Sequence, residues 1–277
     1  MKHDKSIAWP GGAKCAVMLT FDFDAETLWT GRDARNKQRP GVLSQGRYGA
    51  TTGVPKILEM LSEEEVPATF FVPGWTVENH TDKVEMILKE GHEVGHHSYS
   101  HIWVSDDPAA EAEEFEKGLA SLEIVGVKPK GFRSPAGEVS AGLLETQTKH
   151  GLLYDTSLMD DINPYRHVLK DGSKGPIELP WHWSLDDAPF ALFSIASPRP
   201  IFTNSHILEV WKEEFREIYR WGGLFDLVMH PQITGRPSRV ALLREMIAFI
   251  RTFPDVWFAT GADVAEAWAK LEAEGKV

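Results

Sequence analysis

The stretch TFDFDAE, residues 20 to 26, places three carboxylates within five positions at the end of the apolar run CAVMLTF. Crowding anions at the end of a buried strand is costly unless a cation neutralises them. Because side chains alternate along a strand, Asp22 and Asp24 are expected on the same side, with Phe23 turned away. The stretch therefore predicts a bound cation at the end of the first strand.

A second cluster, GHEVGHHSYSH at residues 91 to 101, holds four histidines. His97 and His101 stand four apart, a spacing that places two imidazoles on one side of a helical turn or compact loop. With Asp22 or Asp24 they would offer two nitrogens and one carboxylate to a divalent ion, which leaves coordination positions open for water. The other aspartate can then accept a proton from that water. The two clusters together predict a metal-dependent hydrolase.

The elements that must position these residues follow from the hydrophobic pattern. Apolar, β-branched runs alternate with helical patterns, which is typical of βα units around a parallel sheet or barrel. Val54 and Leu61 belong to one predicted helical face, and a helix is predicted from Pro108 to about residue 126. The strands are predicted at residues 14–22, 67–72, 92–95, 130–134, 152–155, 176–181, 223–230 and 255–259.

Two segments do not fit this pattern. Residues 25–53 contain several glycines and basic residues without periodicity, and loops of this length are uncommon unless they are functional. Since the segment follows the acidic cluster directly, we expect it to cover the site, as a lid. Residues 180–200 are rich in aromatic residues and proline, a composition that suits a pocket wall or a subunit contact.

Composition excludes several classes of function. The chain has 277 residues and a net charge of -12, which disfavours nucleic acid and anionic membrane surfaces as partners. Its single cysteine, Cys15, lies in the first apolar run and is expected to be a small buried hydrophobe. No apolar segment approaches the roughly 18 residues of a membrane span, and the first residues do not match a signal peptide. We therefore expect a cytoplasmic protein.

These residues resemble the polysaccharide deacetylases, the fourth family of carbohydrate esterases. The family's acidic pair after Thr-Phe matches Asp22 and Asp24, and its His-Ser/Thr-x-x-His motif matches residues 97 to 101. The resemblance implies that Asp22 is the catalytic base and that Asp24, His97 and His101 bind the metal. It also implies an α/β fold, a distorted (β/α) barrel of about seven to eight parallel strands, in a single catalytic domain over residues 1–277.

Further residues gain roles from the same resemblance. The family's Arg-x-Pro motif corresponds to RSPAG, residues 133 to 137. Arg133 would orient the base and keep it ionised, while the backbone amide near Ala136 would help to stabilise the oxyanion. Ala136 replaces the aromatic residue usual in sugar-polymer deacetylases. His230, at the end of a predicted strand, would be the general acid toward the leaving nitrogen. The remaining candidates for substrate contacts are Tyr99, Asp155 and Trp183.

The resemblance is strongest to a branch of the family that includes peptidoglycan deacetylases, cyclic imide hydrolases and allantoinases, and whose members tend to form homotetramers. It implies one divalent ion, with zinc expected and cobalt, iron, nickel or manganese as alternatives. The predicted reaction is hydrolysis of a non-peptide amide bond. Two substrates stay open: an N-acetylated sugar, as in peptidoglycan or chitin fragments, or a small cyclic imide or ureide. A non-enzymatic metal site is disfavoured, because structural zinc sites usually have four protein ligands.

Overall fold

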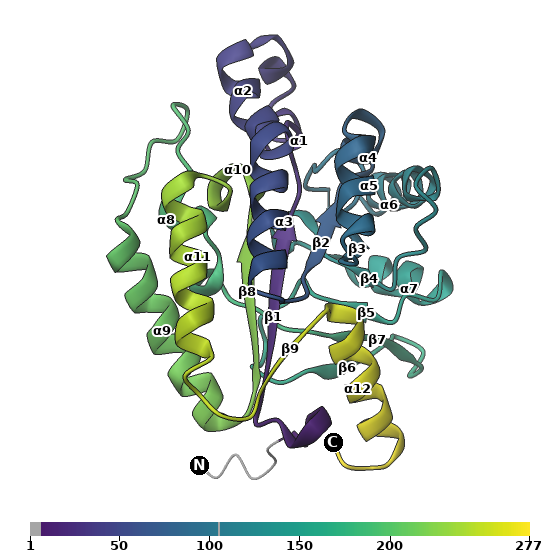
Figure 1. Cartoon of the computed structure of the whole chain (residues 1–277). Helices are drawn as coiled ribbons and strands as arrows, with labels where there is room; N and C mark the ends of the chain where they lie inside the picture. The colour runs from purple at the N-terminus through teal and green to yellow at the C-terminus, as the bar shows by residue number, and fades with distance from the viewer. Residues whose placement is uncertain (1–6, 105) are drawn as a thin grey trace.

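The computed structural model describes residues 7–104 and 106–277, and nine strands in this part of the chain form one sheet (Figure 1). Its order is β6-β7-β5-β4-β3-β2-β1-β8, and β9 pairs with the first half of β1. All pairs are parallel except β6 with β7. The strands are β1 (Cys15–Asp22), β2 (Thr69–Val72), β3 (Glu93–His96), β4 (Gly131–Phe132), β5 (Tyr154–Asp155), β6 (Tyr165–Val168), β7 (Lys174–Glu178), β8 (Leu224–Met229) and β9 (Val256–Ala259).

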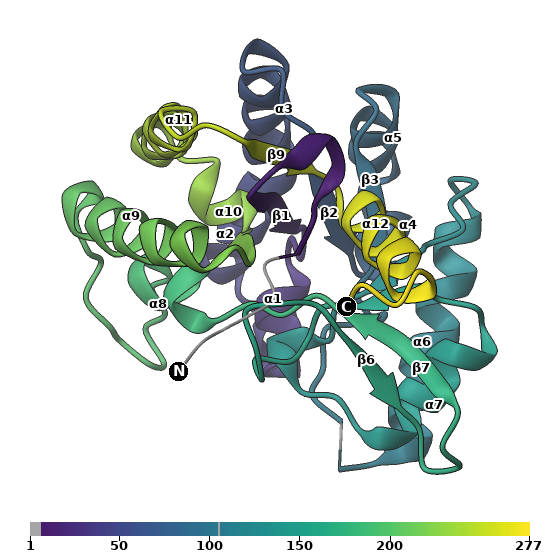
Figure 2. The same cartoon turned by 90° about the horizontal axis from the view of Figure 1, so that it is seen from below.

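Helices surround this sheet on the outside, which is clear when the molecule is seen from below (Figure 2). The sheet curls into an open half-barrel, so the predicted distorted (β/α) barrel is confirmed. The helices are α1 (Thr27–Thr30), α2 (Pro40–Tyr48), α3 (Val54–Glu63), α4 (Gly74–Asn79), α5 (Thr81–Lys89), α6 (Pro108–Glu123), α7 (Ala141–Lys149), α8 (Ala188–Ala191), α9 (Asn204–Trp221), α10 (Pro231–Thr234), α11 (Pro237–Ile250) and α12 (Gly261–Ala273).

Strand β1 lies between β2 and β8, next to one end of the sheet, and every one of its residues is buried. It pairs with β8 along one edge and with β9 and β2 along the other, and its side chains are buried on both faces, as is usual in parallel sheets. The predicted face of α3 is confirmed, since Val54 and Leu61 are both buried. Helix α6 begins at Pro108 as predicted, because the Asp107 side chain accepts hydrogen bonds from two amides of its first turn.

Two predictions about secondary structure are wrong. Strand β6 was not expected, because it is a half-exposed edge strand with no buried apolar run. Residues 25–53 are not an aperiodic loop but form α1, α2, a short 3-10 helix, η2 (Ala34–Gln38), and a π-helical turn, η3 (Gly49–Gly53).

The helices of residues 25–53 were not predicted because close contacts at glycines, rather than a stripe of large apolar residues, pack this segment against the rest of the protein. A Cβ on Gly46 would lie 2.5 Å from the Ala25 carbonyl oxygen, and a Cβ on Gly53 would collide with the Pro231 carbonyl. The segment covers the end of the barrel at which β1 ends (Figure 1). We refer to residues 25–53 as the cap. No helix in the described ranges is long and apolar enough to cross a membrane.

The predicted single domain over residues 1–277 stays a prediction, and residues 1–6, which contribute to the signal-peptide comparison, lie outside the described residues.

Candidate active site and metal centre

The predicted site residues come from parallel strands that end at one edge of the sheet. Asp22 is the last residue of β1, and Asp24 follows it by two positions. His97 directly follows β3, Arg133 directly follows β4, and His230 directly follows β8. Since the carboxyl ends of parallel strands meet at the same edge, residues up to about 200 positions apart gather there.

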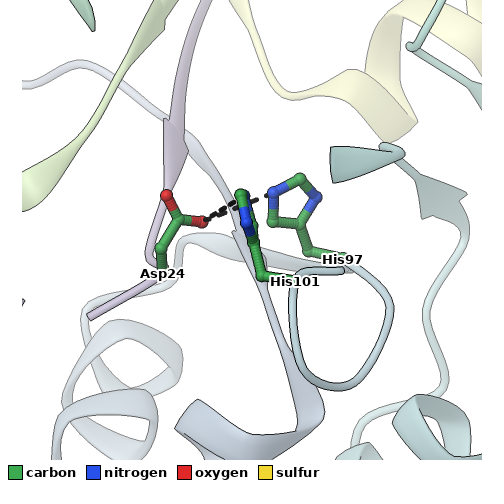
Figure 3. A group of neighbouring side chains, drawn as sticks. All are labelled: Asp24, His97 and His101. Carbon is green, nitrogen blue, oxygen red and sulfur yellow. Dashed lines mark ion pairs between the residues drawn. The ribbon is translucent and has the colours of Figure 1, made fainter. Parts of the chain in front are cut away.

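Asp24, His97 and His101 point toward one another, as Figure 3 shows. The Asp24 Oδ1 atom lies 3.4 Å from His97 Nε2 and 3.6 Å from His101 Nε2. All three residues are buried, and both Asp24 oxygens and His97 Nε2 have no hydrogen-bond partner. Buried polar atoms left without partners are costly, whereas a metal ion between them would satisfy all of them. Their ligand atoms lie within 4.8 Å of one another, so these residues fit a metal ion.

The hydrogen bonds and charges around these side chains prepare them for a metal. His97 Nδ1 lies 2.6 Å from the Arg133 carbonyl oxygen, which can only accept, so Nδ1 carries the hydrogen and Nε2 is left with a lone pair. Burial lowers the pKa of His101 to about 4 and thus keeps it neutral. Burial alone would raise the pKa of Asp24, but His101, His97 and His230 together lower it. A neutral imidazole and an ionised carboxylate are the forms that bind metal.

The histidine loop depends on close contact with the cap. Ser98 and His101 have positive φ angles of 63° and 61°, which are unusual for residues other than glycine. Gly31 lies directly against this loop: a Cβ there would collide with the His101 carbonyl and lie 2.7 Å from the Ser100 carbonyl oxygen. The cap therefore helps to hold the backbone of a predicted metal ligand in place.

We expect Gly31→Ala to weaken metal binding. Gly31 has an ordinary helical φ of -67°, so alanine fits its conformation and the effect comes from the added methyl group pushing the His101 backbone. The zinc affinity, measured by calorimetric titration, should fall roughly 10- to 100-fold, as it does when the support of a ligand is disturbed. Gly41→Ala is the matched control, because nothing lies within 4 Å of a Cβ at that position. Equal zinc affinity in both variants would contradict the contact's role.

The predicted base, Asp22, is held by Arg133. Arg133 Nη1 donates to Asp22 Oδ1 at 3.0 Å, and its Nη2 donates to Asp226 Oδ2 at 2.6 Å. Asp226 lies on β8, and its other oxygen accepts a hydrogen bond from Thr20. Burial alone would lower the pKa of Arg133, but Asp22 and Asp226 raise it. A charged guanidinium thus fixes one oxygen of Asp22, while Asp22 Oδ2 lies 3.8 Å from His97 Nε2.

His230 is held in an equally specific way. Its Nδ1 lies 2.7 Å from Asp187 Oδ1, and its backbone amide donates to Asp187 Oδ2. The other ring nitrogen, Nε2, lies 3.8 Å from Asp24 Oδ2. Burial opposes a charged imidazole, but Asp187 and Asp186 raise the pKa of His230 well above its ordinary value. The ring can therefore carry a proton on Nε2 at neutral pH and present it beside the metal ligands.

A small pocket opens onto these groups. Two of the predicted substrate-contact residues, Ala136 and Trp183, line it. Trp183 is 40% exposed and packs edge-on against Trp181, at 4.7 Å between ring centroids. The two tryptophans thus form an aromatic wall, although position 136 itself lacks an aromatic ring. The cap contributes Leu28 and Arg32 to the same pocket.

The two other predicted contact residues lie elsewhere, so a substrate contact is not supported for either. Tyr99 is not among the described pocket-lining residues: its hydroxyl donates to Glu78, and Lys117 lies over its ring. Asp155 is fully buried and does not line the pocket, and it accepts hydrogen bonds from Gln147 and from the Ser157 amide. Both were candidates through the family resemblance, which indicates segments near the site but not the direction of each side chain, and neighbours in sequence can point in opposite directions.

Sequence reasoning missed Asp187, Asp226 and Trp181. The sequence contains a feature that could have indicated each of these residues. Asp187 and Trp181 lie in the aromatic segment 180–200, and Asp226 is a carboxylate within a buried apolar strand, where an unpaired charge is rare. The sequence does not show the partner of Asp226, because Asp226 and Arg133 are 93 positions apart in the chain.

An open (β/α) barrel that gathers two histidines, a carboxylate and a second carboxylate at its strand ends is the framework of a metal-dependent hydrolase. Comparison with known proteins identifies the family. The family model named Polysaccharide deacetylase matches residues 12–154, about half of the chain, and the chain belongs to this family. Deacetylation of an amide is hydrolysis of a carbon–nitrogen bond other than a peptide bond.

Individual relatives resemble the chain over nearly its whole length. The peptidoglycan deacetylase of Helicobacter pylori is 29% identical over 292 residues, covering 94% of this chain and 98% of the relative. A candidate polysaccharide deacetylase of Mycobacterium smegmatis has a solved structure that is 38% identical, covers 96% of this chain and 94% of its own, and superimposes with a TM-score of 0.89. The Puue allantoinase structure, at 22% identity and a TM-score of 0.84, shares the fold.

Proposed function

We propose that this protein is a metal-dependent deacetylase that removes acetyl groups from N-acetylated sugars, such as peptidoglycan or chitin fragments. The observation that carries the proposal is the convergence of Asp24, His97 and His101 beside a second carboxylate, Asp22, which Arg133 holds in place. Membership of the polysaccharide deacetylase family supports it, as does the similarity to the peptidoglycan deacetylase of Helicobacter pylori. Three ligands with an adjacent base suit catalysis better than a closed structural site does.

Asp24, His97 and His101 would hold one divalent ion. When bound, it supplies positive charge that polarises the amide carbonyl and lowers the pKa of water. We propose zinc as this ion, because two imidazoles and one carboxylate form a common zinc ligand set. Cobalt, iron, nickel and manganese accept the same donors and stay as alternatives.

The side chains around the ligands then divide the proton transfers between them. Asp22 accepts the proton of the attacking water on Oδ2, since Arg133 already occupies its Oδ1 atom. His230 gives the proton on Nε2 to the leaving nitrogen, while Asp187 holds Nδ1 and fixes the orientation of the ring. The backbone amide near Ala136, a pocket-lining residue with a φ of 58°, is proposed to stabilise the oxyanion.

A second candidate function is ring opening of a small cyclic imide or ureide by the same groups. Pocket size favours it: the pocket at the site encloses about 50 Å³. Pockets that bind drug-sized ligands enclose roughly 300–1,000 Å³. The reaction needs the same base and acid, so only the substrate distinguishes the two candidates.

The deciding experiment is an assay of the zinc-loaded and cobalt-loaded protein. We expect acetate release from chitooligosaccharides or peptidoglycan fragments. We expect this release to be lost after chelation, because the unpartnered buried atoms of the three predicted ligands indicate that the site requires a metal ion. Succinimide, hydantoin and allantoin are assayed in parallel for ring opening. Ring opening without acetate release would replace the first candidate by the second, and no hydrolysis of any of these compounds would contradict both.

We also propose a homotetramer. Residues 193–201 leave Phe193, Ile195 and Ile201 exposed, with Ile195 87% exposed, which suits a contact between subunits. Analytical ultracentrifugation tests the oligomeric state. A cytoplasmic location likewise stays a proposal, resting on composition and on the single buried cysteine, Cys15.

A further inference from the structure

An arginine of the cap lines the pocket. Arg32 lines the same pocket as Asp22, His101 and His230. It follows Gly31, whose backbone packs directly against the histidine loop, so its place beside the site is well defined. Its guanidinium lies 5.6 Å from the ring centroid of Trp103, an indole that is 53% exposed. Among the described residues no carboxylate forms an ion pair with it.

Other charged side chains also act on Arg32. Arg199, in the segment after α8, acts on Arg32 as a like charge, and no described carboxylate forms an ion pair with Arg199 either. The carboxylates of Asp24 and Asp186 attract Arg32, but among the described residues neither forms an ion pair with it. By contrast Arg35, three residues along the cap, is paired with Asp33 at 2.9 Å. Burial and the like charge of Arg199 both disfavour the charged form of Arg32, and a bound anion would offset these two effects.

The pocket therefore combines three kinds of group with different tasks. The predicted metal ligands and Asp22 act on an amide, and Trp183, which packs edge-on against the buried Trp181, offers an exposed apolar ring suited to a sugar. Arg32 adds a planar set of donors that matches a carboxylate in both geometry and charge. An N-acetylated amino sugar that carries a carboxylate on an ether substituent of the neighbouring ring carbon has features that suit all three.

We infer that Arg32 is a specificity-determining residue that binds a carboxylate of the substrate, so that the site selects acidic N-acetylated amino sugars over neutral ones. The inference rests on the proposed deacetylase function and names the substrate class of that site. Arg32 takes no part in bond making or breaking: it contributes to binding, and therefore acts mainly on KM.

The test compares two substrates that differ only in charge. Acetate release by the zinc-loaded full chain is measured on N-acetylmuramic acid and on its methyl ester. We expect the ratio of kcat/KM for the acid to that for the ester to be roughly 10 to 100 in the native protein, the range for a hydrogen bond to a charged group. Arg32→Gln should bring this ratio close to one, mainly through the KM for the acid, and Arg32→Lys should restore part of it.

Two further variants keep the result interpretable. Arg35→Gln removes an arginine of the same segment that does not line the pocket, and it should leave the ratio unchanged. Arg199→Gln should lower the ratio by up to about fivefold, since an exposed pair contributes little. Calorimetric titration of N-acetylmuramic acid into zinc-loaded Asp22→Asn measures binding without turnover, and adding Arg32→Gln should weaken that binding by the same factor.

Several outcomes would overturn the inference. A ratio near one in the native protein, or an equal loss on acid and ester in Arg32→Gln, would show that Arg32 is a solvated residue stacked on Trp103 and not a carboxylate-binding group. Either result leaves the deacetylase function intact, because acetate is still released. If the native protein releases no acetate from either compound or from chitooligosaccharides, the proposed function itself fails, and the two failures are thereby separated.

Discussion

Asp22→Asn should keep the metal and lose turnover. The asparagine has the same shape and can still accept a hydrogen bond from Arg133, which holds Oδ1 at 3.0 Å in the native protein. It cannot accept a proton as a carboxylate does, and general-base catalysis contributes roughly 10²- to 10⁴-fold to rate. We therefore expect kcat for acetate release to fall by about 10³-fold, while the zinc content, measured by elemental analysis, stays at the native level.

Two measurements guard this interpretation. The zinc-dependent rise in Tm should be the same in Asp22→Asn and in the native protein, which shows that the three predicted ligands still bind. Asp33→Asn, on the cap, is a control that removes the same charge. The Asp33 carboxylate is partly exposed and forms an ion pair with Arg35. If Asp22→Asn hydrolysed its substrate at the native rate, Asp22 would not be the base.

Asp24→Asn should lose the metal itself. Asp24 is fully buried, and both of its oxygens lack a hydrogen-bond partner. It is also the only carboxylate in the group that it forms with His97 and His101. A neutral amide removes the negative charge that attracts the ion, so zinc affinity should fall by at least about 100-fold, beyond the range seen for outer-shell changes. Acetate release should fall with it at micromolar zinc.

Stability measures the same loss without any substrate. A ligand that binds the folded state stabilises it by RT ln(1 + [L]/Kd), about 2.7 kcal/mol at 100 times Kd. Zinc should therefore raise the Tm of the native protein and of Asp22→Asn, but not that of Asp24→Asn. An undiminished zinc-dependent Tm rise in Asp24→Asn would remove Asp24 from the ligand set and make Asp22 the candidate that replaces it.

The two variants together assign the roles of the acidic pair, Asp22 and Asp24, that precedes the cap. The sequence left open which aspartate is ligand and which is base, apart from the family resemblance. In the structure Arg133 holds Asp22, whereas Asp24 faces His97 and His101 with both oxygens free. This geometry supports the assignment that the resemblance implies, and the variants test it.

Local features of the chain were sufficient to predict much of the fold. The apolar run of β1, the face of α3 and the start of α6 at Pro108 depend on neighbours in sequence, and each appears as expected. The acidic pair and the histidine pair could likewise be recognised, since they stand two and four positions apart. Such patterns are readable because hydrophobic periodicity and helix capping act over a few residues.

Contacts between distant segments were decided only by the tertiary structure. Asp226 meets Arg133 across the sheet, Asp187 reaches His230 from a neighbouring loop, and the cap is seated by glycines that no periodicity reveals. The residue types at these positions are visible in the sequence, but a buried charge or a close backbone contact has meaning only once its partner is known. Sequence alone thus determined the class of fold and the groups that suit a metal, because those depend on local pattern. The tertiary structure decided which carboxylate stays free for the metal, which one is held by Arg133, and which arginine is left unpaired at the pocket, because burial and pairing arise only when distant strands meet.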